Sequence, residues 1–363
     1  MAGGFDAWPD LPASRREAVL AAGREGWRRV FDGVASYNES DRPLRPVFLT
    51  AERYDELTVL TDRLLQLVLD ACRRRAGTAG ELRKAVGVPD GLIEFVDDDE
   101  PVDEHLVMSG RPDLLISDGV PKLVEFNVGS DVGSAWDSDQ VSARFHRLYA
   151  EHGIGGFAPP PVSATEGRFA AIAGALGMRP GERLSMVFRS DGDYPGMDDV
   201  DGLIRALDPF VEQARGHGLD MDIVPVSRLR LDAAQRLWSG DRPVDGILRM
   251  FVCSGMPGSA GLDAMTAALR SGTVRMFTTS ASWLLGNKLV LAWLWEDVDG
   301  LPDADAELVR RHVPRTRLLT SGLLAGAVAG REGLVLKPAD EFGGNGVLVG
   351  AECDAGRWRA DLE

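Results

Sequence analysis

The residues whose types and spacing best support chemistry lie in one short stretch, from Arg111 to Asn127. An apolar, strand-like run occupies residues 114–116, and an Asp-Gly pair at 118–119 is a strong signal for a two-residue turn. A second strand-like run follows at residues 123–127. The stretch therefore predicts a β-hairpin with polar side chains near its open end.

Pairing the two strands across the turn brings Asp113 toward Glu125 and Asn127, with Arg111 beside them. Because side chains alternate along a strand, Leu123 is expected on the same face as Glu125 and Asn127. Magnesium prefers oxygen ligands and is usually shared between one or two carboxylates and substrate phosphates. The three oxygen-bearing side chains fit such a site. The alternative is a surface hairpin whose acidic side chains are simply solvated.

Cationic and glycine-rich segments much later in the chain complement this acidic hairpin. Residues 282–294 read as an apolar helix that carries Lys288. Residues 334–350 read as a strand with Lys337, a tight turn and a second strand. The glycines of the turn are Gly343, Gly344 and Gly346. Glycines at such a turn let backbone N–H groups approach phosphate oxygens closely, and the lysines add fixed positive charge. A plain hairpin turn and an amphipathic helix edge are the alternatives.

Composition limits the class of protein. The chain has 363 residues, 44% of them hydrophobic and 26% charged, which is typical of a globular protein with more than one domain. A formal net charge of −16 argues against a nucleic-acid-binding surface. The three cysteines are widely spaced, and neither a secretory signal nor a membrane span is evident, so we expect a cytoplasmic protein that does not bind membranes.

The pattern along the chain predicts an α/β (α+β) protein with three parts. Residues 1–152 combine a helical region with the acidic hairpin. Residues 153–278 alternate helices and strands at the spacing of βαβ units, which favours a parallel sheet, and residues 233–238 are expected to be helical. Residues 279–363 hold the two lysines and the glycine-rich turn.

Three further polar residues are candidates for substrate binding. Ser130 and Ser134 lie in a Gly/Ser-rich loop directly after Asn127, where backbone N–H groups could meet a substrate carboxylate. An ordinary strand-to-helix turn uses the same residue types. Arg249 lies within an apolar strand, where a buried guanidinium needs a partner.

Taken in order, these motifs resemble the circularly permuted ATP-grasp ligases, the group that includes glutathionylspermidine synthetase. The likeness runs from about residue 111 to the C-terminus and places the metal motif ahead of both lysines. The segments that carry it are Arg111-Pro-Asp113 with Lys122 to Asn127, Asn287-Lys288, His312 to Thr316, and Leu336 to Pro338 with the loop at 343–346.

The resemblance implies an ATP-grasp-like fold of permuted order and a role for each matching position. Asp113, Glu125 and Asn127 would hold Mg²⁺ against the ATP phosphates. Lys288 and Lys337 would contact those phosphates under the glycine-rich lid, and Arg111 would stabilise the oxyanion of the reacting carboxylate. The implied reaction is ADP-forming carbon–nitrogen ligation of a small acid and an amine, an amino acid or a peptide, through an acyl phosphate.

Two departures from the family accompany the likeness. The loop after Asn127 and the lid sequence Phe-Gly-Gly-Asn-Gly differ from the glutathionylspermidine enzymes, so glutathione and spermidine are not expected as substrates. The family also has a further adenine-clamping strand beyond the position where this chain stops, so the lid is expected to be partial. An ATP-dependent phosphotransferase and a non-catalytic ATP-grasp-like binding protein are the alternative functions. The sequence does not indicate an oligomeric state.

Overall fold

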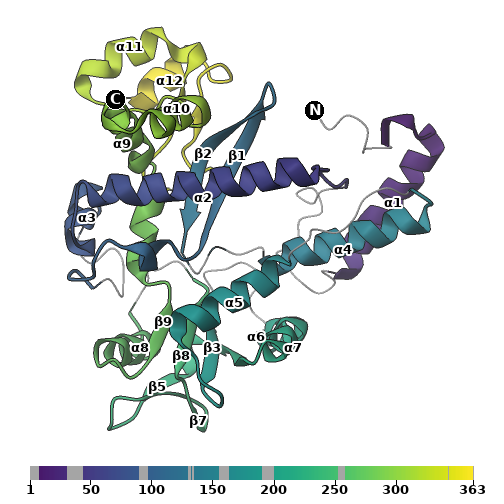
Figure 1. Ribbon diagram of the computed structural model, residues 1–363, viewed down its shortest axis with the longest axis vertical. Helices are drawn as coiled ribbons and strands as arrows, with labels where there is room; N and C mark the ends of the chain where they lie inside the picture. The colour runs from purple at the N-terminus through teal and green to yellow at the C-terminus, as the bar shows by residue number, and fades with distance from the viewer. Residues whose placement is uncertain are drawn as a thin grey trace. The chain divides into compact units, whose positions relative to one another are not determined.

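The computed structural model describes residues 8–30, 44–89, 97–129, 132, 135–154, 163–189, 200–251, 258–341 and 343–362. The chain divides into two compact units, each built from separate stretches (Figure 1). Unit 1 comprises Met1–Thr58 and Ser130–Thr278, and unit 2 comprises Val59–Gly129 and Thr279–Glu363. Among the helices that the structure describes, none has both the length and the apolar character needed to cross a bilayer.

Two long helices form one core of unit 1. Helix α1 (Ala13–Val30) packs against α4 (Ala135–Glu151). Trp27 on α1 meets Phe145 on α4 edge to face, with ring centroids 6.4 Å apart. These side chains belong to an apolar cluster that is completed by Trp8, Val19, Leu148, Tyr149 and Ile154. The helices predicted in these regions are thus confirmed.

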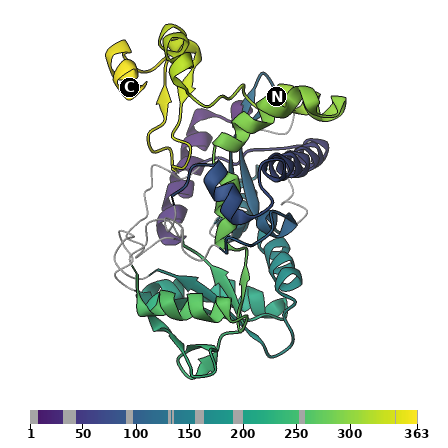
Figure 2. The same ribbon diagram turned by 90° about the vertical axis from the view of Figure 1, so that its left-hand side faces the viewer.

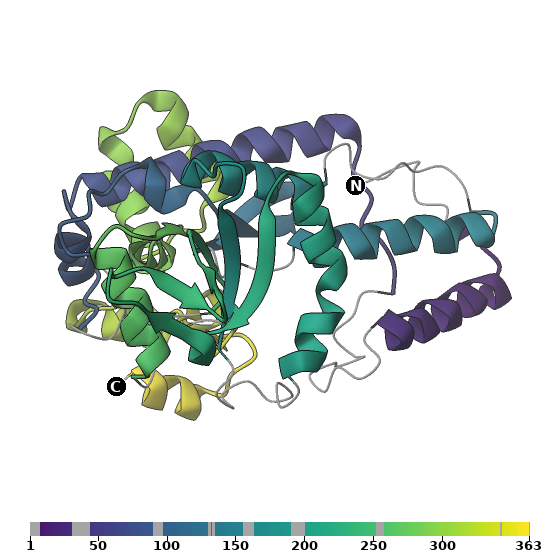
Figure 3. The ribbon, with the colours of Figure 1, turned by 90° about the horizontal axis from the view of Figure 1, so that it is seen from below.

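The predicted parallel sheet forms the second core of unit 1. The strand order is β4-β3-β8-β9, and every neighbouring pair is parallel (Figure 3). The strands are β3 (Arg183–Phe188), β4 (Asp220–Pro225), β8 (Gly246–Arg249) and β9 (Arg275–Phe277). The accompanying helices are α5 (Ala164–Leu176), α6 (Val200–Ala206), α7 (Asp208–Gly216) and α8 (Ala260–Arg270). All six residues of β3 are buried, as expected for a central strand covered on both faces.

The helix predicted at residues 233–238 is wrong. This region follows β5 (Leu229–Leu231) and turns into β6 (Leu237–Ser239), which pairs with β7 (Arg242–Pro243). The Asp232 carboxylate accepts the backbone N–H groups of Ala234 and Arg236, each at 2.9 Å. A local side-chain acceptor of this kind competes with helix formation, so the turn replaces the helix.

Unit 2 surrounds the acidic hairpin with helices. Strands β1 (Gly110–Ser117) and β2 (Val120–Val128) form the predicted antiparallel hairpin. Helix α2 (Ala51–Arg73) begins in unit 1 and continues through Val59 into unit 2, where its buried residues lie. The other elements are α3 (Ala79–Ala85), η3 (Glu104–Val107), η5 (Ser280–Gly286), α9 (Leu289–Asp297), η6 (Val298–Gly300) and α10 (Asp303–His312).

The C-terminal part of unit 2 forms a small subdomain around a two-stranded hairpin (Figure 2). Trp358 is buried there with Leu348 and Leu362, and its indole N–H donates to the Ala327 carbonyl at 3.1 Å. The elements are η7 (Ser321–Leu323), α11 (Leu324–Ala329), η8 (Arg331–Gly333), β10 (Val335–Leu336), β11 (Leu348–Val349) and α12 (Ala355–Leu362). The predicted strand–turn–strand is confirmed, although Lys337 directly follows β10 and was expected within the strand.

Candidate active site

The hairpin register brings the predicted polar residues together. Arg111 lies opposite Asn127, and Asp113 lies opposite Glu125. The Asn127 side-chain amide donates to the Asp113 carboxylate at 3.1 Å and to the Arg111 carbonyl at 3.3 Å. The Arg111 guanidinium is 3.8 Å from the same carboxylate. The expected neighbourhood of these four side chains is therefore present, and it lies wholly within unit 2.

A β-bulge changes which side chains share a face of β2. The register pairs Asp113 with Glu125 and the following residue, Leu114, with Leu123, so Val124 is an extra residue. Leu123 is buried with Phe126, whereas Glu125 is only partly buried. The expectation that Leu123 shares the face of Glu125 is wrong, because the bulge resets the alternation at Val124.

The facing carboxylates are the most unusual electrostatic feature of the hairpin. Like charges placed directly opposite each other in an antiparallel pair are destabilising, yet Asp113 and Glu125 occupy such positions. Oxygens of both carboxylates and of the Asn127 amide form a donor set that suits a hard cation such as Mg²⁺. Among the described residues, no group of three or more His, Cys, Asp or Glu side chains gathers at a metal-binding distance. A cation here would therefore rely on the amide, on water and on ligand oxygens.

Lys288 lies at a break between two helices, and not within one helix as expected. The 3₁₀-helix η5 ends at Gly286, and α9 begins at Leu289. The Asn287 side-chain oxygen accepts the Leu289 N–H at 2.9 Å, and this local side-chain contact, two residues along the chain, favours the break. A β-carbon at Gly286 would lie 3.1 Å from the Phe126 carbonyl oxygen, so glycine permits the close approach of η5 to β2.

Both predicted lysines contact β2. The Lys288 ammonium lies 3.1 Å from the Glu125 carboxylate and also donates to the Glu341 carbonyl. The Lys337 ammonium donates to the Val124 carbonyl at 3.2 Å. Two segments more than 150 residues beyond the hairpin thus bring positive charge to its bulge.

The glycine-rich turn has the conformation that its sequence predicts. Gly343, Gly344 and Gly346 have φ values of 65°, 79° and 67°, which residues with a β-carbon rarely adopt. At Gly346 a β-carbon would also lie 2.6 Å from Pro338. The backbone N–H of Lys288 donates to the Ala339 carbonyl at 2.8 Å, so the segment leading into the turn is fixed to the helix break.

Helix α10 also contacts β2, through residues to which no function was assigned from the sequence. His312, at the end of α10, lies 2.9 Å from the Pro121 carbonyl, and the Lys122 ammonium donates to the Arg311 carbonyl at 2.5 Å. Arg63 on α2 forms a two-point contact with Asp305 in the first turn of α10, and this hydrogen bonding raises the pKa of Arg63. His312 and Lys122 both lie in segments that carry the family resemblance, although no function was assigned to either.

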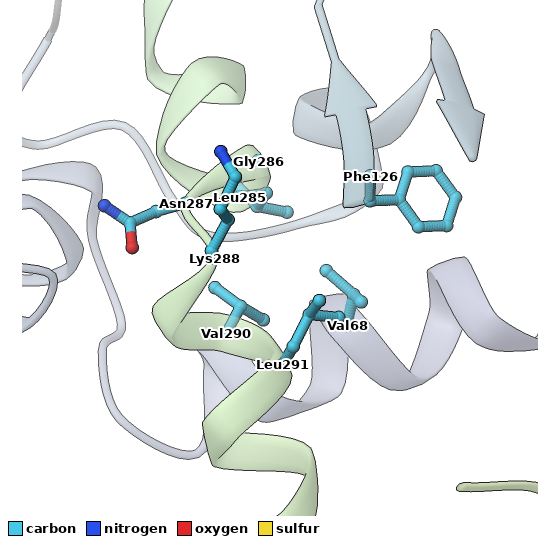
Figure 4. A pocket seen from close by; sticks show the side chains of 8 residues that line it. All are labelled: Val68, Phe126, Leu285, Gly286, Asn287, Lys288, Val290 and Leu291. Atoms are coloured by element: carbon cyan, nitrogen blue, oxygen red, sulfur yellow. The ribbon is translucent and has the colours of Figure 1, made fainter. Parts of the chain in front are cut away.

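A small cavity lies beside the lysine-bearing break (Figure 4). Its volume is about 10 Å³, which is room for about one water molecule. It is lined by Val68, Phe126, Leu285, Gly286, Asn287, Lys288, Val290 and Leu291. The Asn287 amide points away from Phe126 in Figure 4, and its nitrogen is buried without a hydrogen-bond partner in the described part of the chain. The cavity is too small for a substrate.

The remaining candidates are Arg249, Ser130 and Ser134. Arg249 is in β8 of unit 1, where it is buried, donates to the Phe251 carbonyl and lies 5.9 Å from the Phe251 ring centroid. These contacts give the guanidinium a partner within unit 1, although its Nε is buried without a hydrogen-bond partner among the described residues. Ser130 and Ser134 fall outside the described residues, so their predicted role stays a prediction.

Comparison with known proteins gives a likeness of fold. No protein-family model matches the chain, and no curated protein matches its sequence. Among solved structures, a glutathione synthetase-like effector from Globodera pallida, in its apo form, is similar with a TM-score of 0.52 and 13% identity. The similarity covers 84% of this chain and 71% of the effector. At this identity the comparison shows a glutathione synthetase-like α/β fold.

Proposed function

We propose that the chain is an ATP-dependent, ADP-forming carboxylate–amine ligase with its nucleotide site in unit 2. The observation that carries the proposal is the approach of Lys288 and Lys337 to the acidic hairpin. A site for magnesium and polyphosphate needs oxygen ligands beside fixed cations. The glutathione synthetase-like fold supports the same class of reaction.

Each residue of the hairpin has a distinct part in this proposal. Asp113, Glu125 and Asn127 would hold Mg²⁺ through their side-chain oxygens. When bound there, the ion would neutralise phosphate charge and orient the phosphates. Lys288 and Lys337 would hold the phosphate oxygens, and the N–H groups of the glycine turn at 343–346 would cover them.

Arg111 is the group placed to handle the substrate carboxylate. Its side chain is half exposed at the open end of the hairpin and is only loosely paired with Asp113, at 3.8 Å. A guanidinium presents parallel N–H donors that match a carboxylate. We assign Arg111 to orient the acid and to stabilise negative charge on its oxygen when an amine attacks the carbonyl carbon.

The proposed reaction has two displacement steps. A carboxylate oxygen attacks the γ-phosphorus of ATP, the bond to the ADP oxygen breaks, and an acyl phosphate forms. The amine nitrogen then attacks the acyl carbon, inorganic phosphate leaves, and the nitrogen loses a proton to give an amide. The substrates would be small acids and amines of the amino-acid or peptide class. Positioning and charge neutralisation supply most of the catalysis.

A non-catalytic binding protein is the second candidate, and one contact favours it. The Glu125 carboxylate already has a cationic partner in Lys288, so its charge is compensated without a metal ion. The similar solved structure is itself described as an effector. A binding protein would keep nucleotide affinity without releasing ADP.

Turnover assays separate these functions. The full chain is incubated with ATP, MgCl₂ and a panel of amino acids and short peptides, while ADP and amide products are followed by mass spectrometry. A ligase releases ADP and forms an amide only when both an acid and an amine are present. A phosphorylated acid formed without an amine requirement would indicate a phosphotransferase, and ATP binding without ADP would indicate a binding protein.

Two variants of matched charge test the hairpin directly. Glu125→Ala should abolish ADP release. Glu332→Ala removes an acid that is 82% exposed in the same unit and should leave turnover unchanged. Normal turnover by the Glu125 variant would contradict the assignment of the site.

A further inference from the structure

One ion pair in the proposed site joins two residues that should bind different ligands. The Lys288 ammonium and the Glu125 carboxylate are 3.1 Å apart, and their side chains are only 10% and 19% exposed. Under the proposed function, Glu125 would hold the metal ion and Lys288 would hold phosphate. Neither side chain can serve its ligand fully while it is paired with the other.

We propose that Lys288 and Glu125 form an exchange latch that makes metal and nucleotide binding mutually dependent. This inference rests on the proposed function and adds a property to the same site. A metal ion that engages Glu125 releases the Lys288 ammonium toward phosphate. A phosphate that engages Lys288 releases the Glu125 carboxylate toward a metal ion. A ligand that binds alone must supply the whole free energy needed to separate the pair. When both ligands bind, they share that free energy.

The contacts around the pair keep the latch closed without a ligand. The Lys288 backbone N–H donates to the Ala339 carbonyl at 2.8 Å, and its ammonium also donates to the Glu341 carbonyl. Lys288 therefore holds the segment before the glycine turn as well as the hairpin. On the hairpin side, Asp113 faces Glu125 across the strands, so the ammonium also offsets repulsion between two carboxylates.

The other charged groups of the site are not latched in this way. The Asp113 side chain is 47% exposed, and its carboxylate lies 3.8 Å from the Arg111 guanidinium, which is a weak ion pair. Lys337 donates to the neutral Val124 carbonyl at 3.2 Å, and a carbonyl does not compete with Lys337 for phosphate as a carboxylate would. The coupling should therefore depend on Lys288 and Glu125 and should be insensitive to Lys337.

Equilibrium binding to the full chain tests the latch with three probes. These are ATP with EDTA, ATP with MgCl₂, and MnCl₂ alone followed by electron paramagnetic resonance. The variants are Glu125→Gln, Lys288→Met and, as the matched control, Lys337→Met. The coupling factor is the ratio of ATP affinities with and without Mg²⁺. The Lys337 control measures how much coupling arises simply because ATP itself chelates magnesium.

The latch predicts that removing either partner raises the affinity of the other partner for its own ligand. Glu125→Gln should bind metal-free ATP several-fold more tightly than the wild type, because Lys288 is released, and its coupling factor should fall by about tenfold. Lys288→Met should bind Mn²⁺ alone more tightly than the wild type, because Glu125 is released. Lys337→Met should weaken ATP binding with and without Mg²⁺ by the same factor.

Each outcome decides between the latch and its alternatives. If Glu125→Gln binds metal-free ATP no more tightly than the wild type does, the latch is overturned. This result is decisive even if Lys288→Met fails to fold. Loss of coupling in Lys337→Met overturns it as well. If the wild type binds neither ATP nor Mn²⁺, the proposed function fails and the latch fails with it. If the wild type binds both and the Glu125 variant gains nothing, only the latch fails.

Discussion

A double-mutant cycle on Lys288 and Glu125 should show that this pair stabilises unit 2 in the absence of ligand. Removing one partner of a fully buried ion pair costs about 3–5 kcal/mol, and an exposed pair contributes about 0–1 kcal/mol. These side chains are 10% and 19% exposed, so Lys288→Met should cost about 2 kcal/mol, between those limits. Part of this cost comes from the Glu125 carboxylate, which then lies opposite Asp113 without its ammonium partner.

The second half of the cycle is expected to be milder. Glu125→Gln keeps a neutral acceptor for the ammonium, and Lys288 retains the Glu341 carbonyl, so the cost should be about 1 kcal/mol. Once Glu125 is neutral, Lys288→Met leaves no buried charge unpaired. The double variant should therefore be more stable than the sum of the single costs implies, with a coupling energy of about 1–2 kcal/mol.

Urea unfolding followed by tryptophan fluorescence measures the cycle. The chain has two compact units, so the transition of unit 2 must first be identified. Asp305→Ala serves this purpose because it removes the two-point partner of Arg63 within unit 2. A coupling energy below about 0.3 kcal/mol, within the usual additivity of distant sites, would refute the reasoning that this contact is a stabilising ion pair.

Three further predictions concern protonation and glycine positions. Burial raises the pKa of Glu100 to about 7 from an ordinary value of 4.5, so the folded chain retains this proton after the unfolded chain has lost it. Its contribution to stability is fully present below pH 4.5 and is lost as the pH rises to about 7. Glu100→Gln should therefore raise the melting temperature more at pH 8 than at pH 5, and an equal gain at both pH values would contradict the assignment. Gly261→Ala should destabilise unit 1 strongly in thermal melts, because a β-carbon there would lie 1.9 Å from a backbone carbonyl oxygen. Gly167→Ala, in an open helical position, should stabilise the chain by about 0.5–1 kcal/mol, and similar effects of the two substitutions would contradict the packing argument. Gly346→Ala should weaken ATP binding measured by calorimetry because φ is 67° there; Gly326→Ala, in an open helix position, should not, and equal losses would argue against a role for the turn.

The hairpin and its partners show what the sequence can predict. The Asp-Gly turn at 118–119 determines the pairing from Ser117 with Val120 as far as Leu114 with Leu123, so the approach of Asp113 toward Glu125 was predicted from local sequence. Their direct pairing depends on the bulge at Val124. The positive φ values of the glycine turn followed for the same reason, because only glycine adopts them at little cost. The four-stranded parallel sheet followed from the alternation of helices and strands.

The failures share a different physical origin. At residues 233–238 the acceptor on Asp232 overrode the helical pattern. At Asn287 a side-chain oxygen that accepts the Leu289 N–H accompanies a break in an apolar helix. The extra residue Val124 changed the faces of β2 without any glycine or proline to signal it. In each case one side chain or one inserted residue changed the structure that the regular pattern predicts.

The bulge is also the feature that gives the site its present chemistry. In a regular strand, Leu123 would share the face of Glu125, and an apolar side chain would lie beside the carboxylate. With Val124 inserted, Leu123 packs into the interior while Glu125 meets the Lys288 ammonium and the Val124 carbonyl meets Lys337. Deleting Val124 would make Leu123 and Glu125 neighbours in a regular strand, with Leu123 still buried and Glu125 still on the opposite face. We expect this variant to fold and to keep Glu125 beside Lys288, but to bind ATP more weakly in calorimetry, because Lys337 loses the Val124 carbonyl that positions it. If the variant bound ATP as tightly as the wild type does, the bulge would have no part in forming the site.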